Sequence, residues 1–379
     1  MNAQALTRLE LTQFRQFHDV ALEDLGRINL LVGPNNSGKT SVLEAVELFC
    51  RPLDIGTWVD TAWRREIKAA RTPLPEALRW LFPMAVDYPK KNPNQIWIFG
   101  KGAFAGRRLL ATCEEFKEIA GQADSEQESG RVREDADEES GLAIQLLADF
   151  EKPLPGETGE TRDYQNRAEF KAYTKRNLTY SSKVEEPFLE VASISPFSHR
   201  VESLSTKLFT SSIKTERLDQ NLREEFVRIL QKLDPDILDI TLVETGRTTN
   251  TLLLKHKKTG QTPLSAFGDG IRRALLIALS IPSVRNGVLL IDELETALHV
   301  SALDNVLKLL KWAADEYNVQ VFATTHSLEA VDAVLKALEH DPEALVAYQL
   351  NKTQEGTRVK RMPEDFLNRV RLQRGLDIR

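Results

Sequence analysis

The 379-residue chain contains little cysteine and no long apolar run. Its two cysteines, Cys50 and Cys113, cannot build a disulfide framework and stand in no metal-ligand spacing such as C-x-x-C. The first residues hold no basic region followed by an apolar run, and no stretch approaches the roughly 18 apolar residues of a membrane helix. We therefore expect a cytoplasmic protein in a reducing compartment, without signal peptide, membrane span or membrane partner.

The chain also lacks an excess of positive charge. Its 50 Lys and Arg against 56 Asp and Glu give a formal net charge of -6, which argues against coating nucleic acid by bulk charge. One segment, Gly121–Gly141, holds eight acids and two bases and so accounts for all of that charge. We expect a solvated, mobile loop there, rather than a docking site for a basic partner or a mimic of nucleic-acid charge. The remaining body is neutral, so DNA binding on local basic surface stays open.

The hydrophobic pattern predicts an α/β protein. The first 31 residues indicate a short β-sheet that ends in a buried strand, Ile28–Val32, and apolar spacing from Thr40 predicts a helix ending near Pro52. Helical spacing returns over Ser203–Leu233, and from Ser265 the spacing is that of repeated α/β units. Four strand-like runs between these parts, at 95–99, 108–113, 142–150 and 187–194, predict an antiparallel β-layer.

The loop between the first buried strand and the helix fits G-x-x-x-x-G-K-[ST] over Gly33–Thr40. Its glycines let backbone N–H groups turn toward phosphate oxygens at a helix N-terminus, Lys39 neutralises the β- and γ-phosphates, and the Thr40 hydroxyl ligates Mg²⁺. The strand before and the helix after favour this interpretation over a chance glycine turn. The expected ATP-binding residues of the loop are Asn35, Asn36, Ser37, Gly38, Lys39 and Thr40.

Two later apolar strands end in residues that suit a nucleotide site. The run 287–291 leads into Asp292, which can hold the metal's water shell, and Glu293, which can polarise an attacking water as the catalytic base. The run 319–325 ends at His326, which can contact the γ-phosphate or that water. A capping acid and a structural histidine are the alternatives when each motif is taken alone.

The segment Leu264–Gly270 places small residues directly before a helical run. Such a helix start exposes N–H groups that bind anions, whereas the plainer alternative is a glycine turn with Asp269 as N-cap. With the phosphate loop, the Asp-Glu strand and the His strand, this order of motifs resembles an ATP-binding cassette (ABC) head. The resemblance implies an ABC-ATPase head with a P-loop parallel core sheet, an antiparallel β-layer and a helical insertion. It also implies that Ser265, Gly268 and Gly270 act in trans on ATP bound by another subunit.

Further motifs narrow the resemblance. The opening Phe14-Arg15-Gln16-Phe17, the signature form S-A-F-G-D-G-I-R-R and the run Asp292–His299 resemble the branch with RecF, the ATPase domains of OLD-type nucleases and stand-alone anti-phage ATPases. The clear match covers residues 4–50 and 262–353 and implies a nucleotide contact for Arg15. It also implies one composite head, with a P-loop part over 1–56, β-layer and insertions over 57–240, and a signature part over 241–379.

Two features depart from transporter cassettes. The signature is L-S-A-F-G-D-G instead of L-S-G-G-Q, and His299 stands where those proteins carry an aspartate. For the glutamine that cassette ATPases use to sense Mg²⁺, Gln95 and Gln145 are the candidates. The signature and the long middle insertion argue against a transporter subunit.

Spacing separates the remaining relatives. Asp292 follows Lys39 by only 253 positions, which leaves no room for the coiled-coil arms of SMC-type proteins. The 53 residues after His326 are too few for the Toprim nuclease domain of OLD proteins. We therefore expect an ATP- and Mg²⁺-dependent switch that associates with itself and controls a separately encoded effector in phage defence, such as a Toprim-type nuclease or a toxin. The alternative is a RecF-like repair ATPase that clamps duplex DNA.

Overall fold

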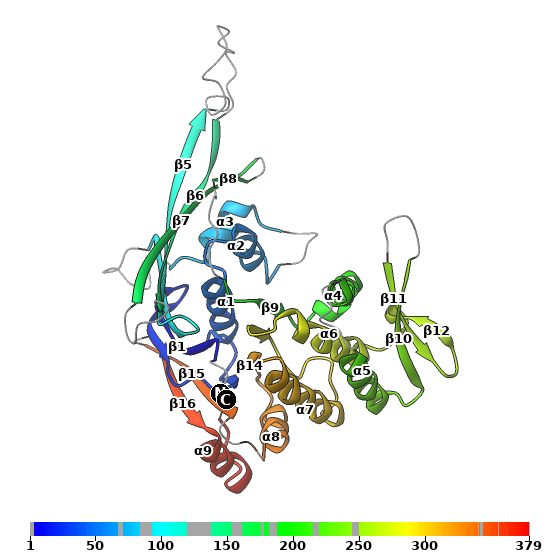
Figure 1. The fold of residues 1–379 in the computed structure, drawn as a ribbon. Coiled ribbons are helices and arrows are strands. Elements are labelled where there is room, and N and C mark those ends of the chain that lie inside the picture. The colour runs from blue at the N-terminus through cyan, green and yellow to red at the C-terminus, as the bar shows by residue number, and fades with distance from the viewer. Residues whose placement is uncertain are drawn as a thin grey trace. The chain divides into compact units, whose positions relative to one another are not determined.

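The computed structural model of the chain divides into two compact units (Figure 1). Unit 1 comprises Met1–Arg8, Leu22–Leu43 and Leu189–Arg379, and unit 2 comprises Leu9–Ala21 and Glu44–Phe188. Most of the acidic segment expected as a loop lies outside the described residues, and its last four residues begin a strand. The structure describes residues 4–66, 71–83, 93–119, 138–153, 161–175, 178–181, 188–214, 220–244, 250–339, 341, 344–354 and 356–378.

A six-stranded sheet forms the centre of unit 1. Its order is β16 (Gly356–Pro363), β15 (Leu345–Thr353), β3 (Ile28–Val32), β14 (Gln320–Thr324), β13 (Val288–Ile291) and β9 (Val191–Ile194). All neighbours from β15 to β9 pair in parallel, and only the edge hairpin of β15 and β16 is antiparallel. Every residue of β3, β13 and β14 is buried, as expected for parallel strands covered on both faces. The predicted α/β fold with a parallel core sheet is confirmed.

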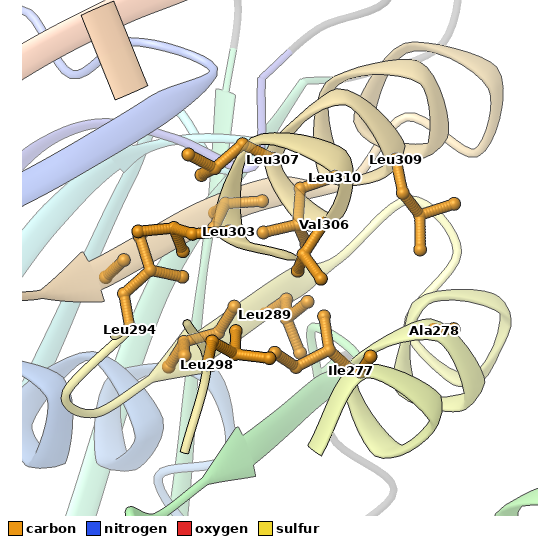
Figure 2. Close-up of a cluster of buried hydrophobic side chains, with 14 of the residues drawn as sticks. Ile277, Ala278, Leu289, Leu294, Leu298, Leu303, Val306, Leu307, Leu309 and Leu310 are labelled. Atoms are coloured by element: carbon orange, nitrogen blue, oxygen red, sulfur yellow. The ribbon is translucent and has the colours of Figure 1, made fainter. Parts of the chain in front are cut away.

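Helices cover this sheet and continue its core. The close packing joins Ile277 and Ala278 of α6, Leu289 of β13, and the apolar side chains of α7 such as Val306 and Leu310 (Figure 2). Since α6 precedes β13 in the sequence and α7 follows it, the packing of both helices on Leu289 determines where the chain enters and leaves this strand. The helices of unit 1 are α4 (Glu202–Lys214), α5 (Gln220–Leu233), α6 (Asp269–Ser283), α7 (Val300–Glu316), α8 (Leu328–Ala337) and α9 (Glu364–Asn368), with a π-turn at Arg369–Gln373.

A three-stranded antiparallel sheet leads into α6. Its strands are β10 (Ile237–Glu244), β11 (Asn250–His256) and β12 (Gly260–Pro263), and β12 runs directly into the 3₁₀ turn η3 (Leu264–Ala266). The buried Leu252 and Leu254 of β11 join the core of unit 1. No described helix is both long enough and apolar enough to span a bilayer.

Unit 2 is built around a seven-stranded sheet in the order β2-β1-β4-β5-β6-β7-β8. Along β5 and β6 the register runs from the pair Gly106 and Glu151 to the pair Ile119 and Glu138, and one face of both strands is buried. The strands are β1 (Leu6–Phe14), β2 (Phe17–Leu22), β4 (Gln95–Gly102), β5 (Gly106–Ile119), β6 (Glu138–Pro153), β7 (Thr161–Tyr173) and β8 (Thr179–Ser181). Two short helices, α2 (Ile55–Ala62) and α3 (Leu74–Arg79), belong to the same unit, while α1 (Lys39–Cys50) runs from unit 1 into unit 2.

The expected antiparallel layer needs one correction. Three of the four predicted runs become β4, β5 and β6, but the fourth, at 187–194, forms β9 in the parallel sheet beside β13. The strand next to β6 in the antiparallel layer is β7 instead, with a register from the pair Gly141 and Tyr173 to the pair Pro153 and Thr161. The placement of the run 187–194 was wrong because the partner of a strand depends on long-range packing, and the local pattern of a short run carries no information about that packing.

Candidate functional site

The loop Gly33–Thr40 follows β3 and opens α1, as its motif requires. Gly33 has φ +146°, and a Cβ there would lie 2.4 Å from the carbonyl oxygen of Leu350, so only glycine fits. Gly38 has φ +99° and Asn36 has φ +62°, which turns the backbone repeatedly before the helix starts. Such a succession of turned residues at a helix N-terminus forms an anion-binding concavity.

Two side chains of the loop fit a triphosphate. The Lys39 ammonium donates to the carbonyl oxygens of Gly33 and Pro34, at 2.8 and 2.9 Å, and to no other acceptor among the described residues. Burial lowers the pKa of Lys39, while the nearby charges of Asp292, Glu295 and Glu293 act in the opposite direction. The Ser37 hydroxyl is buried and finds no hydrogen-bond partner within the described part of the chain. A partly desolvated cation and an unpaired buried hydroxyl together suit a bound phosphate.

Thr40 and Asp292 come together from distant parts of the sequence. The Thr40 hydroxyl lies 3.1 and 3.2 Å from the two carboxylate oxygens of Asp292, which directly follows β13. Hydroxyl and carboxylate oxygens are the ligand types that Mg²⁺ prefers. The pairing predicted from the two motifs is therefore present, with both side chains half-buried in unit 1.

Thr324, which the sequence analysis did not single out, organises the same carboxylates. Its hydroxyl donates to Asp292 Oδ1 at 2.6 Å and accepts from the backbone N–H of Glu293 at 2.8 Å. It stands at the end of β14, the strand beside β13, and is 1% exposed. Its position two residues before His326, at the end of the apolar run 319–325, could have indicated this role from the sequence.

Replacing Thr324 by valine should lower the free energy of unfolding by about 1–3 kcal/mol, since the Glu293 backbone N–H loses its acceptor and Asp292 Oδ1 loses one of its two hydroxyl donors while the shape is kept. Urea unfolding at neutral pH measures this. Thr210→Val is the matched control, because the Thr210 hydroxyl bonds only the Thr206 carbonyl within α4, and that carbonyl keeps its helical bond. A Thr324→Val loss no larger than that of the control would contradict the assigned role.

Glu293 has a strained backbone and a positioned carboxylate. Its φ of +49° lies in the left-handed region that a non-glycine residue rarely adopts. The Thr296 hydroxyl donates to Glu293 Oε2 at 2.8 Å, and the Leu294 N–H donates to the Thr324 carbonyl at 2.9 Å. The carboxylate is half-buried, held at one oxygen and available at the other for a water molecule.

Arg273 of α6 bonds this strained backbone, and its role was not predicted from the sequence. The side chain is fully buried and donates to the carbonyl oxygens of Asp292 and Glu293, at 2.9 and 3.2 Å, and to that of Ser195 at the end of β9. Burial lowers its pKa to about 10, against the opposing effect of the nearby carboxylates, so the guanidinium stays charged at neutral pH. One buried cation thus ties the signature helix to the Asp-Glu segment.

His326 lies at the end of β14, as predicted, and is paired with a residue that the sequence analysis had not selected. Its Nδ1 lies 3.2 Å from Glu295 Oε1, and its backbone N–H donates to the same oxygen at 3.1 Å. The side chain remains 49% exposed. Glu295 therefore holds the imidazole in place and leaves its second nitrogen accessible.

The signature segment starts α6, where the alternative with Asp269 as N-cap is wrong. The N-cap is Gly268, which has no side chain to bond the helix, and Asp269 is the first helical residue. Ser265 lies in η3, and both Ser265 and Gly268 are exposed. A Cβ added at Gly270 would lie 3.1 Å from the Ala297 carbonyl. None of the three predicted signature residues bonds the loop Gly33–Thr40 within the described part of the chain.

His199 is a buried histidine beside this helix start, with Nε2 3.5 Å from Asp269 Oδ2. Burial lowers its pKa from 6.5 and the charges of Arg200 and Arg273 act in the same direction, while Asp269 opposes them. As the pH falls, His199 in the unfolded chain is protonated at a higher pH than in the folded chain. The free energy of unfolding is therefore unaffected by this group above pH 6.5 and falls as the pH drops below it. In His199→Gln, the free energy of unfolding should differ less between pH 7.5 and pH 5.5 than in the wild type, as measured by urea unfolding at both pH values. An equal difference in the two proteins would show that His199 does not cause the loss of stability at low pH.

Three further predicted residues belong to unit 2, whereas Lys39, Asp292 and His326 belong to unit 1. Arg15 forms an ion pair with the fully buried Glu44, at 2.8 Å, which also accepts from Arg65. Gln95 and Gln145 lie on β4 and β6 of the seven-stranded sheet, not on the sheet that carries Asp292. A nucleotide contact of Arg15 stays a prediction.

The fold and site together define a class. The parts of an ABC-type ATPase head are present: a P-loop after a buried parallel strand, an Asp-Glu pair and a histidine at the ends of two neighbouring strands, and a signature helix tied to that pair. Family comparison agrees: the family described as "AAA domain, putative AbiEii toxin, Type IV TA system" matches residues 96–332, and "AAA ATPase domain" matches residues 5–128. The chain belongs to the first of these families and is an ATPase.

Individual relatives are more distant. An "ATP/GTP phosphatase" of Helicobacter pylori is 25% identical over 346 residues, which is 86% of each chain. The DNA replication and repair protein RecF of Pseudomonas paraeruginosa is 54% identical over 45 residues, 12% of each chain. Among solved structures, the SMC head domain from Thermotoga maritima aligns over 94% of this chain and 98% of its own, with a TM-score of 0.43 and 14% identity.

Proposed function

We propose that the chain is an ATP-dependent switch that dimerises or oligomerises through composite ATP sites and controls a separate effector, a nuclease or toxin, in phage defence. The observation that carries the proposal is that the site is divided within one chain. Lys39, Thr40 and Asp292 lie together, whereas Gly268 at the start of α6 bonds none of them within the described residues and faces open space. A second copy can supply the missing side of the site.

Each residue then has a chemical task. Lys39 and the N–H groups of Gly33–Thr40 would bind the phosphates of ATP, and Thr40 and Asp292 would hold Mg²⁺, which neutralises charge as the phosphoryl group leaves. Glu293 would accept the proton of the attacking water, and His326, oriented by Glu295, would contact the γ-phosphate. The lifetime of the ATP-bound assembly would follow the rate of this hydrolysis.

The family description names a putative AbiEii toxin of a type IV toxin–antitoxin system, and such a system involves a second, separately encoded chain. A direct test expresses tagged Glu293→Gln protein together with the products of its neighbouring reading frames. We expect a partner to copurify with this protein when ATP is present and not to copurify with Lys39→Ala protein. The same strain should lose protection against phage when either gene is deleted; protection that persists without the chain would refute the defence role.

A RecF-like clamp on duplex DNA is the second candidate, favoured by the 45-residue match to RecF. It requires duplex affinity that depends on ATP and falls steeply between 50 and 200 mM salt, on the order of 10³-fold or more for several phosphate contacts. Fluorescence anisotropy with a labelled duplex measures it. Absence of binding at low salt, with ATP present, removes this candidate.

A further inference from the structure

Three basic side chains surround the carboxylate of Asp269, the first residue of α6. Arg272 Nη1 lies 3.3 Å from Oδ1, while Arg200 Nη2 and His199 Nε2 lie 3.4 and 3.5 Å from Oδ2. His199 and Arg200 come from the 3₁₀ turn Ser198–Arg200, which follows β9 and packs against α6. Two segments of unit 1 therefore meet at the signature.

Arg200 differs from the other two basic residues in its exposure. The side chain of His199 is 1% exposed and that of Arg272 is 14% exposed, whereas that of Arg200 is 60% exposed. The Arg200 guanidinium lies over the ring of Phe197, which is itself 63% exposed. Its Nε and Nη1 donate to no described residue. Because exposed ion pairs contribute little to stability, the fold does not account for this outward guanidinium.

The neighbouring glycine has no role within the chain either. Gly268 has φ -63° and ψ 157°, which any residue adopts, and an added Cβ would meet no atom within 4 Å. The N–H groups of Asp269 and Gly270 have no acceptor among the described residues. Free N–H groups at the start of a 15-residue helix attract anions, but the Asp269 carboxylate repels them. Two guanidiniums on that carboxylate reverse the sign of the charge at the helix start.

We propose that Arg200 binds the phosphates of an ATP molecule held in the P-loop of a second copy of the chain, with Asp269 holding its guanidinium in place. The planar fork of arginine can bond two phosphate oxygens at once while one N–H group stays on the carboxylate. The inference deepens the proposed function and rests on it, since it names a residue of the composite site that acts across the dimer.

The test measures nucleotide binding and dimerisation separately in the Glu293→Gln background, where hydrolysis is slow. Fluorescent ATP titrated at nanomolar protein gives the affinity of the monomer, and sedimentation velocity with ATP gives the dissociation constant of the dimer. Arg200→Ala should leave monomer affinity unchanged and raise the dimer dissociation constant roughly 10- to 100-fold, the effect of one hydrogen bond to a charged group. Arg200→Lys, which keeps the charge without the fork, should fall between the two.

Arg228→Ala is the matched control, because Arg228 is 66% exposed and pairs with Glu225 on α5, away from the signature. It should leave both constants unchanged. If Glu293→Gln dimerises and Arg200→Ala does not weaken that dimer, the role of Arg200 is refuted and the switch stands. If Glu293→Gln itself stays monomeric with ATP, the proposed function fails first. A lower monomer affinity in Arg200→Ala would place the residue in its own chain's site and also refute the inference.

Discussion

Glu293→Gln is expected to lower the kcat of ATP hydrolysis by about 10²- to 10⁴-fold, the range for loss of a general base. Glutamine has the shape of glutamate and can still accept from the Thr296 hydroxyl, which bonds Glu293 Oε2 at 2.8 Å. It cannot take a proton from water. The Asp292 carboxylate and the P-loop are untouched, so ATP affinity should remain within a few-fold of wild type. A phosphate-release assay and equilibrium binding of a fluorescent ATP analogue separate the two effects.

The same substitution should also lengthen the life of the ATP-bound assembly. If ATP joins two copies, blocked hydrolysis keeps them joined, and Glu293→Gln should elute as a dimer or larger species in ATP and as a monomer in ADP. Glu225→Gln, a surface change on α5, is the control and should behave as wild type in both nucleotides. Hydrolysis above about a tenth of the wild-type rate would place the base elsewhere, with Glu295 the nearest candidate because it holds His326.

Local patterns were sufficient to predict the core sheet and the phosphate loop. The apolar runs that became β3, β13 and β14 are buried at every residue, and such runs identify parallel strands covered on both faces. The P-loop is a contiguous motif whose glycines are required by positive φ and by the close approach of Leu350. Both features depend on neighbours in sequence, which is why the sequence reveals them.

Features that depend on long-range packing were not predicted. The run that became β9 has the same local character as an antiparallel strand, and only its pairing with β13 places it in the parallel sheet. Thr324 and Arg273 are ordinary residues in sequence, yet they bond groups 32 and 19–20 positions away, respectively. Their roles follow from the meeting of strand ends and a helix in space, and no short motif contains that information.

The second large effect is expected from the removal of Arg273. Arg273→Met keeps most of the side-chain volume but leaves the carbonyl oxygens of Ser195, Asp292 and Glu293 buried without this donor. The Ser195 and Glu293 carbonyl oxygens keep the backbone N–H donors of Ser198 and Thr296, but loss of one partner from a buried charged network costs about 3–5 kcal/mol. We therefore expect a loss of about 3–5 kcal/mol in the free energy of unfolding, measured by urea denaturation.

The neighbouring arginine provides the control for this prediction. Arg272 is 14% exposed and bonds a half-exposed carboxylate, so Arg272→Met should cost no more than about 1 kcal/mol. Arg273→Lys keeps the charge but bonds fewer carbonyls, and it should recover part of the stability while kcat stays low, since the left-handed turn at Glu293 is no longer held. Equal stability losses in the two methionine variants would show that burial, and not the bonds to the Asp-Glu segment, sets the cost. A lysine variant with full stability and full kcat would show that a point charge suffices to position Glu293.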